Sequence, residues 1–249
     1  MSVDVDRIEQ MFEHSVMSPA LSLDAAPPRR ADVRELQERI RSLENAHADY
    51  PVFPVAPGLE NLFPHGGLRR GVVYDIDPSP SLLWALIAQA TTSGTWCALV
   101  GMPDAGLAAA EGMGVNLDRL VLIPHPGEQW LSVVSALIDV VGIVALGPST
   151  PPSDRVLSTV LGRLREREAT ILSRPGWPRT EASISVSAHR WRGLGEGHGV
   201  LHEHHISVVA RSRQSAALRS CEMVIDAWGA HYNPVVASVT DISRHRSAG

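Results

Sequence analysis

The sequence contains no lysine, and all 22 of its basic residues are arginine. This absence excludes any chemistry that needs a lysine amine, such as a P-loop lysine on a nucleotide phosphate or a Schiff base. The formal net charge is −5, so no overall positive charge favours nucleic acid. A lysine-dependent enzyme and a strongly basic nucleic-acid binder are therefore both excluded.

Cysteine is also scarce, because Cys97 and Cys221 are the only two. Two distant cysteines do not form a disulfide framework, which fits a reducing compartment. The first residues, "MSVDVDRIEQMF", are acidic and lack the apolar region of a signal peptide. The longest apolar run, around 133–146, is interrupted at Ser135, Asp139 and Gly142 and is too short to span a bilayer. We therefore expect a cytoplasmic protein without a membrane partner.

Residues 1–50 are predicted to form an arm that contains one amphipathic helix at 32–47. Asp32 is a suitable N-cap, and Glu35 follows three residues later. One narrow apolar stripe runs along an otherwise charged helix and consists of Val33, Leu36, Ile40 and Leu43. Such a helix either packs on its own domain or binds a partner or a second copy of the chain. The arm is followed by "PVFPVAP", whose prolines favour an edge strand or an extended connector.

Residues 51–239 are predicted to form one α/β domain. Strands are expected at 72–76, 96–100, 119–123, 142–146 and 170–173, with helices between them at 81–92, 105–113, 128–140 and 154–168. This alternation predicts a mostly parallel sheet with helices on both faces. Two alternating stretches, 181–191 and 200–213, are joined by glycine-rich residues and predict a late antiparallel hairpin, with a last strand at 221–228. Residues 240–249 are predicted to be a disordered tail.

Several short motifs of this domain resemble those of RecA-type recombinases. Gly66, Gly67, Leu68 and Gly71 resemble the approach to the P-loop, and "GTWCALV" resembles the second core strand. The most specific match is "GVNLDRLVLIPHPGEQW", at 114–130. The resemblance covers roughly residues 52–230 and implies a RecA-like core.

The active-site residues of that family are missing in three places. A gapless overlay from Gly71 puts Pro78 at the first P-loop glycine, Leu83 at the last one, Trp84 at the lysine and Ala85 at the magnesium-binding hydroxyl. Proline has no N–H to donate to a phosphate. The family's catalytic glutamate falls on Pro103, and no acidic residue occurs between Val140 and Ser153, where a Walker-B aspartate is needed. The resemblance therefore implies a fold that neither binds nor hydrolyses ATP, and we expect no cofactor and no enzymatic activity.

Degenerate RecA-like proteins of this kind include the ImuA-type family, of which the actinobacterial ImuA-prime group is the best match. Supporting features are the arginine-rich composition, the charged N-terminal helix and "HRWRGLGEGHGVL" in the late hairpin. The resemblance implies an adaptor in error-prone translesion synthesis during the SOS response to DNA damage. Its partners would be an ImuB-type polymerase paralogue and an error-prone C-family polymerase. The alternative is a SulA-like inhibitor of cell division that binds the tubulin-like division protein.

Two groups of residues are candidates for binding partners. RecA-type subunits pack on neighbours through an N-terminal helix and strand. We therefore predict partner binding, including self-association, at Val33, Leu36, Ile40, Leu43, Val52, Phe53 and Val55. Weak DNA contact is a second hypothesis, because arginine binds phosphates and tryptophan stacks on bases. It concerns Arg174, Trp177, Arg179, Arg190 and Arg192, whose alternative is a solvated or protein-binding surface.

The late hairpin is rich in histidine, but its spacing does not favour a metal site. His202 and His204 share one face of the expected strand, whereas His205 points to the other face. We expect solvated or interface histidines, with a zinc site as the alternative. Three tryptophans on apolar elements, Trp84, Trp96 and Trp130, are expected in the core. Trp84 is further predicted to fill the former nucleotide cavity.

Overall fold

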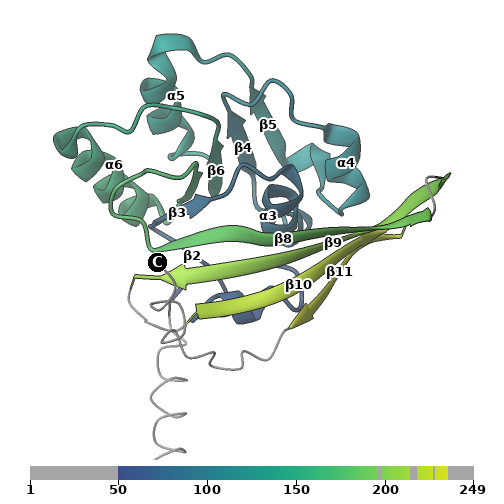
Figure 1. Cartoon of the computed structure of the whole chain (residues 1–249). Coiled ribbons are helices and arrows are strands. Elements are labelled where there is room, and N and C mark those ends of the chain that lie inside the picture. The colour runs from purple at the N-terminus through teal and green to yellow at the C-terminus, as the bar shows by residue number, and fades with distance from the viewer. Residues whose placement is uncertain (1–49, 196–197, 214–217, 227, 235–249) are drawn as a thin grey trace, which may run out of the picture. The chain divides into compact units, whose positions relative to one another are not determined.

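The computed structural model describes residues 50–195, 198–213, 218–226 and 228–234, which all belong to one compact unit spanning 49–249. Figure 1 shows strands and helices alternating through this unit, followed by a long hairpin. The predicted helix at 32–47, with Val33, Leu36, Ile40 and Leu43, lies outside the described residues, as does the tail at 240–249. These assignments stay predictions. No helix in the described part of the chain is long and apolar enough to cross a bilayer.

One nine-stranded sheet organises the unit, in the order β11-β10-β9-β8-β3-β7-β6-β4-β5. Its first six strands in sequence are β3 (Val73–Ile76), β4 (Cys97–Val100), β5 (Leu120–Ile123), β6 (Ile143–Leu146), β7 (Thr170–Ser173) and β8 (Ala182–Gly195), and they pair in parallel. Three further strands, β9 (His198–Ser212), β10 (Leu218–Asp226) and β11 (Gly229–Pro234), add antiparallel to β8. The predicted α/β fold with a mostly parallel sheet and a late antiparallel hairpin is therefore confirmed.

The strands β4, β6 and β7 are buried on both faces, as expected for the centre of a parallel sheet, whereas the edge strand β5 is only partly buried. Alternate residues of β4 and β6 enter two different cores, one on each face of the sheet. The first core contains α3 (Pro80–Thr92) and Ala110 of the short α4 (Leu107–Gly112). The second contains residues of α5 (Trp130–Leu137) and α6 (Asp154–Arg167). Helices thus cover both faces of the parallel part of the sheet, and loops surround the ends of its strands.

A separate two-stranded sheet precedes the main sheet. It pairs β1 (Val52–Pro54) with β2 (Gly67–Arg69), and the one-turn helix η1 (Glu60–Leu62) lies between them in sequence. The sequence did not predict β2, because its glycines are typical of a turn. Gly67 is required because a Cβ there would overlap the carbonyl oxygen of Phe53 across the pair.

Two predicted helices are shorter in the structure than in the sequence-based assignment. The one expected at 128–140 begins with the one-turn helix η3 (Gly127–Gln129) and continues as α5, which ends at Leu137. The one expected at 105–113 is α4, preceded by Gly106 at its N-cap position. A further single turn, η2 (Leu117–Arg119), leads into β5. The last strand, β11, was not predicted, because it continues directly from a tight turn at Trp228 and Gly229.

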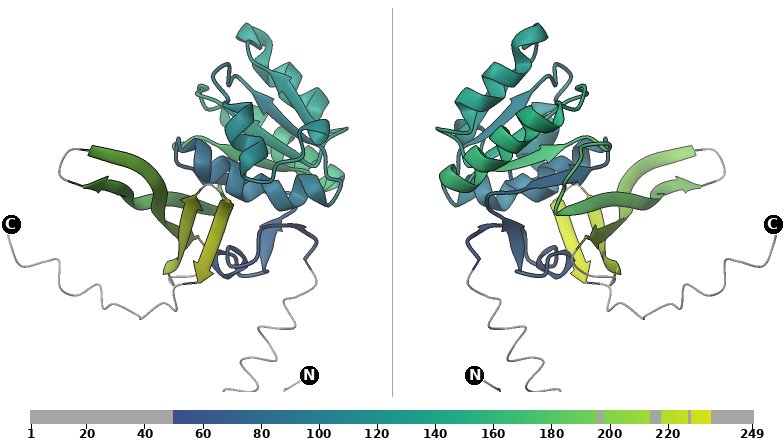
Figure 2. Two further views of the ribbon diagram at one scale, coloured as in Figure 1. Left: turned by 90° about the vertical axis from the view of Figure 1, so that its right-hand side faces the viewer. Right: turned by 90° about the vertical axis from the view of Figure 1, so that its left-hand side faces the viewer.

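The antiparallel strands extend well past the parallel ones and form an arm. From here on, "the arm" means residues 187–193 of β8 and 199–205 of β9, and not the predicted N-terminal arm at 1–50. Figure 2 shows this hairpin projecting away from the helices in both views. Two register shifts interrupt β8, between Val186 and Ala188 and between Arg192 and Leu194. Such bulges increase local twist, which bends the hairpin away from the body of the unit.

Candidate functional site

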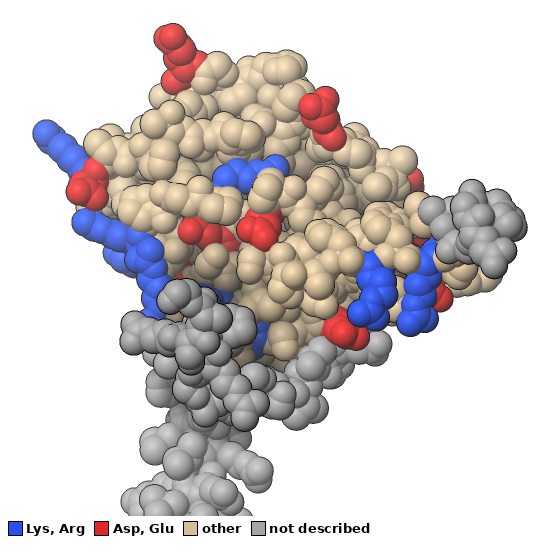
Figure 3. Space-filling view, viewed as in Figure 1, with Lys and Arg blue, Asp and Glu red and all other residues tan. Residues whose placement is uncertain are grey.

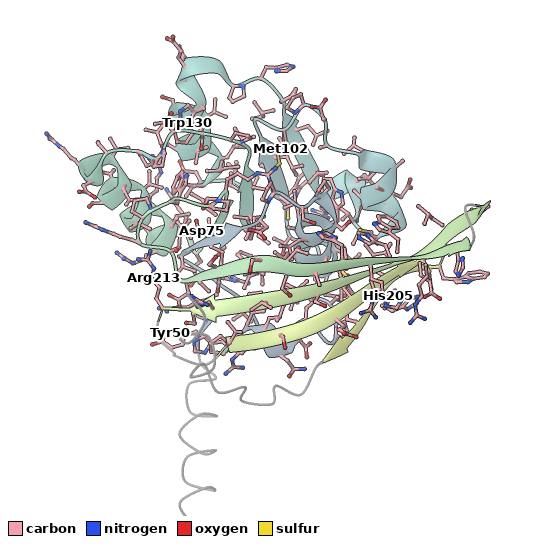
Figure 4. The ribbon with its side chains drawn as sticks, viewed as in Figure 1. Tyr50, Asp75, Met102, Trp130, His205 and Arg213 are labelled. Carbon is pink, nitrogen blue, oxygen red and sulfur yellow. The ribbon has the colours of Figure 1, made fainter. Side chains whose placement is uncertain are left out.

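The carboxyl ends of β3, β4, β6 and β7 meet at one edge of the sheet. This is where open α/β folds bind ligands, because the loops there surround a crevice. A cavity of about 410 Å³ lies at this edge, lined by Ile76, Asp77, Ser79, Pro80, Leu83, Trp84, Gly101, Met102, Pro103, Asp104, Ala105, Pro148 and Arg174. Met102 is labelled beside the end of β4 in Figure 4. The cavity includes the region where the RecA overlay places a P-loop.

The loop between β3 and α3 uses its backbone N–H groups within the chain. Asp77 donates its N–H to the Ile184 carbonyl at 3.0 Å, and Ser79 donates to the Asp77 carbonyl at 2.7 Å. Pro78 and Pro80 have no N–H at all. The next turn is closed as well, because the Leu82 N–H bonds the Ser79 hydroxyl at 3.3 Å. This loop therefore does not present the array of free N–H groups that a phosphate needs.

Trp84 lies on the first helix of the fold at the position that the overlay assigns to the P-loop lysine. It is 1% exposed and belongs to the larger of the two cores. Its indole Nε1 has no hydrogen-bond partner among the described residues. The predicted burial of Trp84 is confirmed, although an open cavity remains beside it.

Charge at the cavity is also unfavourable for a nucleotide. Asp77 and Asp104 contribute carboxylates to the lining, and Arg174 is the basic residue among the lining residues. The Asp77 carboxylate accepts a hydrogen bond from the Val186 N–H at 2.8 Å, which fixes it at the rim. The Arg174 side chain is only partly solvated, and this burial lowers the pKa of its guanidinium. Two carboxylates beside one arginine would repel a triphosphate rather than hold it.

A second cavity, of about 570 Å³, lies next to the first and shares Gly101, Pro103 and Pro148 with it. The loops that follow β4 and β6 meet here without an intervening side chain. A Cβ at Gly147 would overlap the carbonyl oxygen of Gly101. The described lining of this cavity contains no acidic residue. No Walker-B carboxylate is thus present where the overlay would need one.

Asp75, on β3, is half-buried below this edge (Figure 4). Burial raises the pKa of its carboxyl. The Ser173 hydroxyl, at 3.0 Å from Oδ1, and the charge of Arg213 act in the opposite direction. The Asp75 carboxyl group therefore links β3 to β7 through the Ser173 hydroxyl. It does not line either cavity.

The predicted partner-binding residues before the main sheet are buried within the unit. Phe53 is 4% exposed, packs against Gly142 and lies under the guanidinium of Arg70, 4.6 Å from its ring centroid. Val55 is 2% exposed, and Val52 is half-buried. The chain's own core therefore occupies Phe53 and Val55 in this structure, and partner contact by these two residues stays a prediction.

The five predicted DNA-contact residues do not gather on one surface. Trp177 is 3% exposed and packs edge-on against Trp130, with ring centroids 6.2 Å apart, so it is not available to stack on a base. Arg174 lines the first cavity, and Arg179 is exposed beside Ser158 of α6 at 3.2 Å. Arg190 and Arg192 lie on the arm, some eight residues or roughly 25 Å of extended strand beyond the start of β8.

The arm contains an aromatic stack that the sequence did not predict. The rings of Trp191 and His204 are 3.7 Å apart and parallel to within 3°. His189 extends the stack, because its Nδ1 lies 3.1 Å from His204 Nε2. Cross-strand pairing of Trp191 with His204 produces this contact. The signal was present as alternating aromatic residues, but the register that pairs them depends on the bulges in β8.

The histidines form no metal site in the described part of the chain, where no cluster of three or more metal-ligating side chains occurs. His205 bonds Glu203 at 2.8 Å on the face opposite His204. Trp96 also differs from expectation. It is 42% exposed at the amino end of β4, where Arg119 lies 5.2 Å from its ring centroid. An apolar neighbourhood in sequence therefore did not place Trp96 in the core.

Comparison with known proteins gives similarities for part of the chain. The family model described as the MT3502 N-terminal domain matches residues 61–179. The uncharacterized protein Rv3395c of Mycobacterium tuberculosis (strain ATCC 25618 / H37Rv) is 37% identical over 119 residues, which are 47% of this chain and 58% of that protein. The chain thus matches less than two thirds of this relative's length. The matched family region contains the loops that form both cavities and ends before the arm.

Among solved structures, the crystal structure of the RadB recombinase is similar, with a TM-score of 0.49 and 18% sequence identity. The alignment covers 70% of this chain and 96% of that one. This is a likeness in fold at low identity, and no statement about activity follows from it.

Proposed function

We propose that the protein is a non-catalytic adaptor that supports error-prone translesion synthesis after DNA damage. In this proposal it binds an ImuB-type polymerase paralogue and, through it or directly, an error-prone C-family polymerase in the cytoplasm. The identity of the partners comes from the resemblance to ImuA-type proteins. What the geometry supports is the non-catalytic part of the proposal.

One observation supports a non-catalytic role above all others. The loop at 77–80 uses its N–H groups internally, and Trp84 occupies the position of the phosphate-binding cation. Carboxylates of Asp77 and Asp104 line the remaining cavity. A RecA-like unit that lacks a nucleotide site can still bind other proteins through its surface. Protein binding is therefore the activity that we propose for it.

The first test is isothermal titration of the full chain with magnesium ATP, together with a phosphate-release assay. We expect no saturable heat and no release above a protein-free blank. Stoichiometric binding with turnover would overturn the non-catalytic role.

The second test identifies the partners by affinity purification from DNA-damaged cells of the protein's own host. We expect the ImuB-type paralogue among the recovered chains. Recovery of the tubulin-like division protein without a polymerase would instead support the SulA-like alternative.

A double variant tests whether the predicted helix at 32–47 contacts the partner. Leu36→Asp with Ile40→Asp places two charges on the apolar stripe and should abolish recovery of the partner. The matched control, Gln37→Asp with Ser42→Asp, adds the same two charges to polar positions and should retain it. Equal recovery with both variants would remove this helix from the proposal.

A further inference from the structure

The outer edge of β8 on the arm has no strand beside it. On this side β8 pairs with β3 only over Ala182–Ile184. Asp77 closes the next step, because its carboxylate accepts the Val186 N–H. From 187 to 192 every residue is exposed, and no described residue forms a backbone hydrogen bond across this edge. Unpaired N–H and C=O groups therefore remain along the outer edge of residues 187–192.

The two bulges set the limits of this edge. Between them, residues 188–192 pair regularly with Ser207 through Glu203 of β9. The other side of β9 is covered by β10 as far as His204. The stretch 188–192 is thus a short, regular edge strand that its own hairpin supports. Such edges accept an additional strand from another chain.

One face of this edge is basic. Arg190 and Arg192 point to the same face, which they share with Glu203 and His205. Arg192 Nη1 lies 3.8 Å from Glu203 Oε2, and the Glu203 carboxylate also accepts from His205 at 2.8 Å. Arg190 has no ion pair or hydrogen bond from a described side chain, and residues 187–193 contain no acid. Figure 3 shows basic side chains side by side on the arm, close to its tip.

The opposite face is flat and aromatic. Trp191 is 57% exposed and is held against His204, which in turn is bonded to His189. Burial and the neighbouring His189 and His205 lower the pKa of His204, which favours the neutral form of this ring. The edge therefore offers a basic face and an apolar aromatic face on alternate residues.

We propose that this edge of β8, residues 188–192, binds an extended peptide segment of a partner protein by β-strand addition. The segment alternates acidic and apolar side chains. Its acidic side chains face Arg190 and Arg192, and its apolar side chains cover Trp191 and His189. Main-chain hydrogen bonds supply affinity, and the alternation of the two faces supplies specificity. This inference rests on the proposed function only in that the protein acts by binding other proteins.

A second copy of the chain fits this edge poorly. In symmetric antiparallel registers centred on Arg190 or Trp191, an arginine of one copy lies opposite an arginine of the other. Like charges directly opposite each other destabilise a strand pair. Single-stranded nucleic acid is also less suitable, because its phosphates could accept from the free N–H groups but would leave the C=O groups of the edge without a donor, whereas a peptide strand pairs with both. An acidic extended peptide satisfies the arginines and the open edge together.

The test is fluorescence anisotropy of the full chain with a labelled peptide in which glutamate and valine alternate. We expect saturable binding that weakens with salt. A peptide with lysine in place of glutamate should bind at least about tenfold more weakly. Two further probes have N-methyl groups on alternate residues, one set on each edge of the peptide. One set should abolish binding and the other retain it, which only strand addition explains.

Variants of the protein locate the site. Arg190→Glu with Arg192→Glu should weaken binding about tenfold or more and should favour the lysine peptide. The matched control is Arg155→Glu, at an exposed position near the start of α6, which should leave affinity unchanged. No binding, equal loss with both N-methylated probes, or tighter binding of a thymine oligonucleotide than of the acidic peptide would overturn the inference.

The outcome separates this inference from the proposed function. If the arm variant no longer binds the acidic peptide but still recovers the polymerase paralogue from cells, the edge at 188–192 binds peptides and the paralogue binds at another surface. If the peptide binds as expected but no polymerase paralogue is recovered, strand addition at this edge is supported and the proposed function is contradicted.

Discussion

The carboxyl edge of the parallel sheet and the outer edge of the arm differ in where their backbone hydrogen bonds go. At the carboxyl edge, the N–H groups of Asp77, Ser79 and Leu82 are all bonded within the chain, and prolines remove others. On the arm, the backbone groups of 187–192 that point away from β9 have no partner among the described residues. The first region thus uses its N–H groups within the chain, whereas the second leaves groups at a sheet edge that an added strand could pair with.

The largest expected effect compares Trp84, beside the carboxyl edge, with Trp228, in the turn before β11. Trp84→Ala should lower the free energy of unfolding by about 3–5 kcal/mol, because it removes a fully buried side chain and leaves a cavity. Trp228→Ala, at a side chain that is 90% exposed, should change stability by less than about 0.5 kcal/mol. Urea denaturation of both variants measures the difference. Equal stabilities would mean that Trp84 does not fill the former nucleotide region.

A glycine substitution tests how closely the loops of the carboxyl edge approach each other. Gly147→Ala should destabilise the protein by about 1–3 kcal/mol, because the new methyl group overlaps the Gly101 carbonyl. Gly162→Ala is the matched control, since nothing lies within 4 Å of its Cβ on α6. The control should stabilise the protein by about 1 kcal/mol through helix propensity. Thermal or urea unfolding shows whether the two alanines have opposite signs.

The helix caps give a smaller effect at the same edge. Ser79→Ala should cost about 1 kcal/mol, because the Ser79 hydroxyl accepts the Leu82 N–H at the start of α3. Ser153 precedes α6 in the same position but makes no side-chain capping bond. Ser153→Ala should therefore cost clearly less. A larger loss at Ser153 would contradict the assignment of the cap.

The smallest effect concerns pH and the arm. The pKa of His204 is lowered in the folded protein, so the unfolded chain binds a proton that the folded arm does not. The contribution of the neutral stack is therefore present above about pH 6.5 and is lost as the pH falls below it. The hydrogen-exchange protection factors of the arm amides, which correct for the pH dependence of intrinsic exchange, should fall on acidification in this range. His204→Gln should remove that dependence, and an unchanged pH profile would contradict this role for His204.

Much of the central fold was predictable, because β3, β4, β6 and β7 are short apolar runs separated by helical patterns. The burial of Trp84 was predictable from its apolar helix, and the lack of a donor at Pro78 follows directly from the residue type. The role of Phe53 was not, because an apolar residue between prolines can face its own core or a partner. Only the position of Gly142 beside the ring decides between these alternatives.

The aromatic stack was not predictable for a different reason. His189, Trp191 and His204 are visible in the sequence, but their contact depends on strand register. A slip of one residue would move each of them to the opposite face. The two bulges in β8, between Val186 and Ala188 and between Arg192 and Leu194, set this register. The alternating sequence alone does not show where they occur.

The close approach of Gly101 and Gly147 has a mechanical consequence for both cavities. The loops after β4 and β6 touch through their backbones, and each cavity is lined by Gly101 and Pro148. Because no side chain separates these loops, neither can move toward the other without overlap. The wall shared by the two cavities is therefore backbone, and no side-chain rearrangement there can enlarge one cavity at the expense of the other.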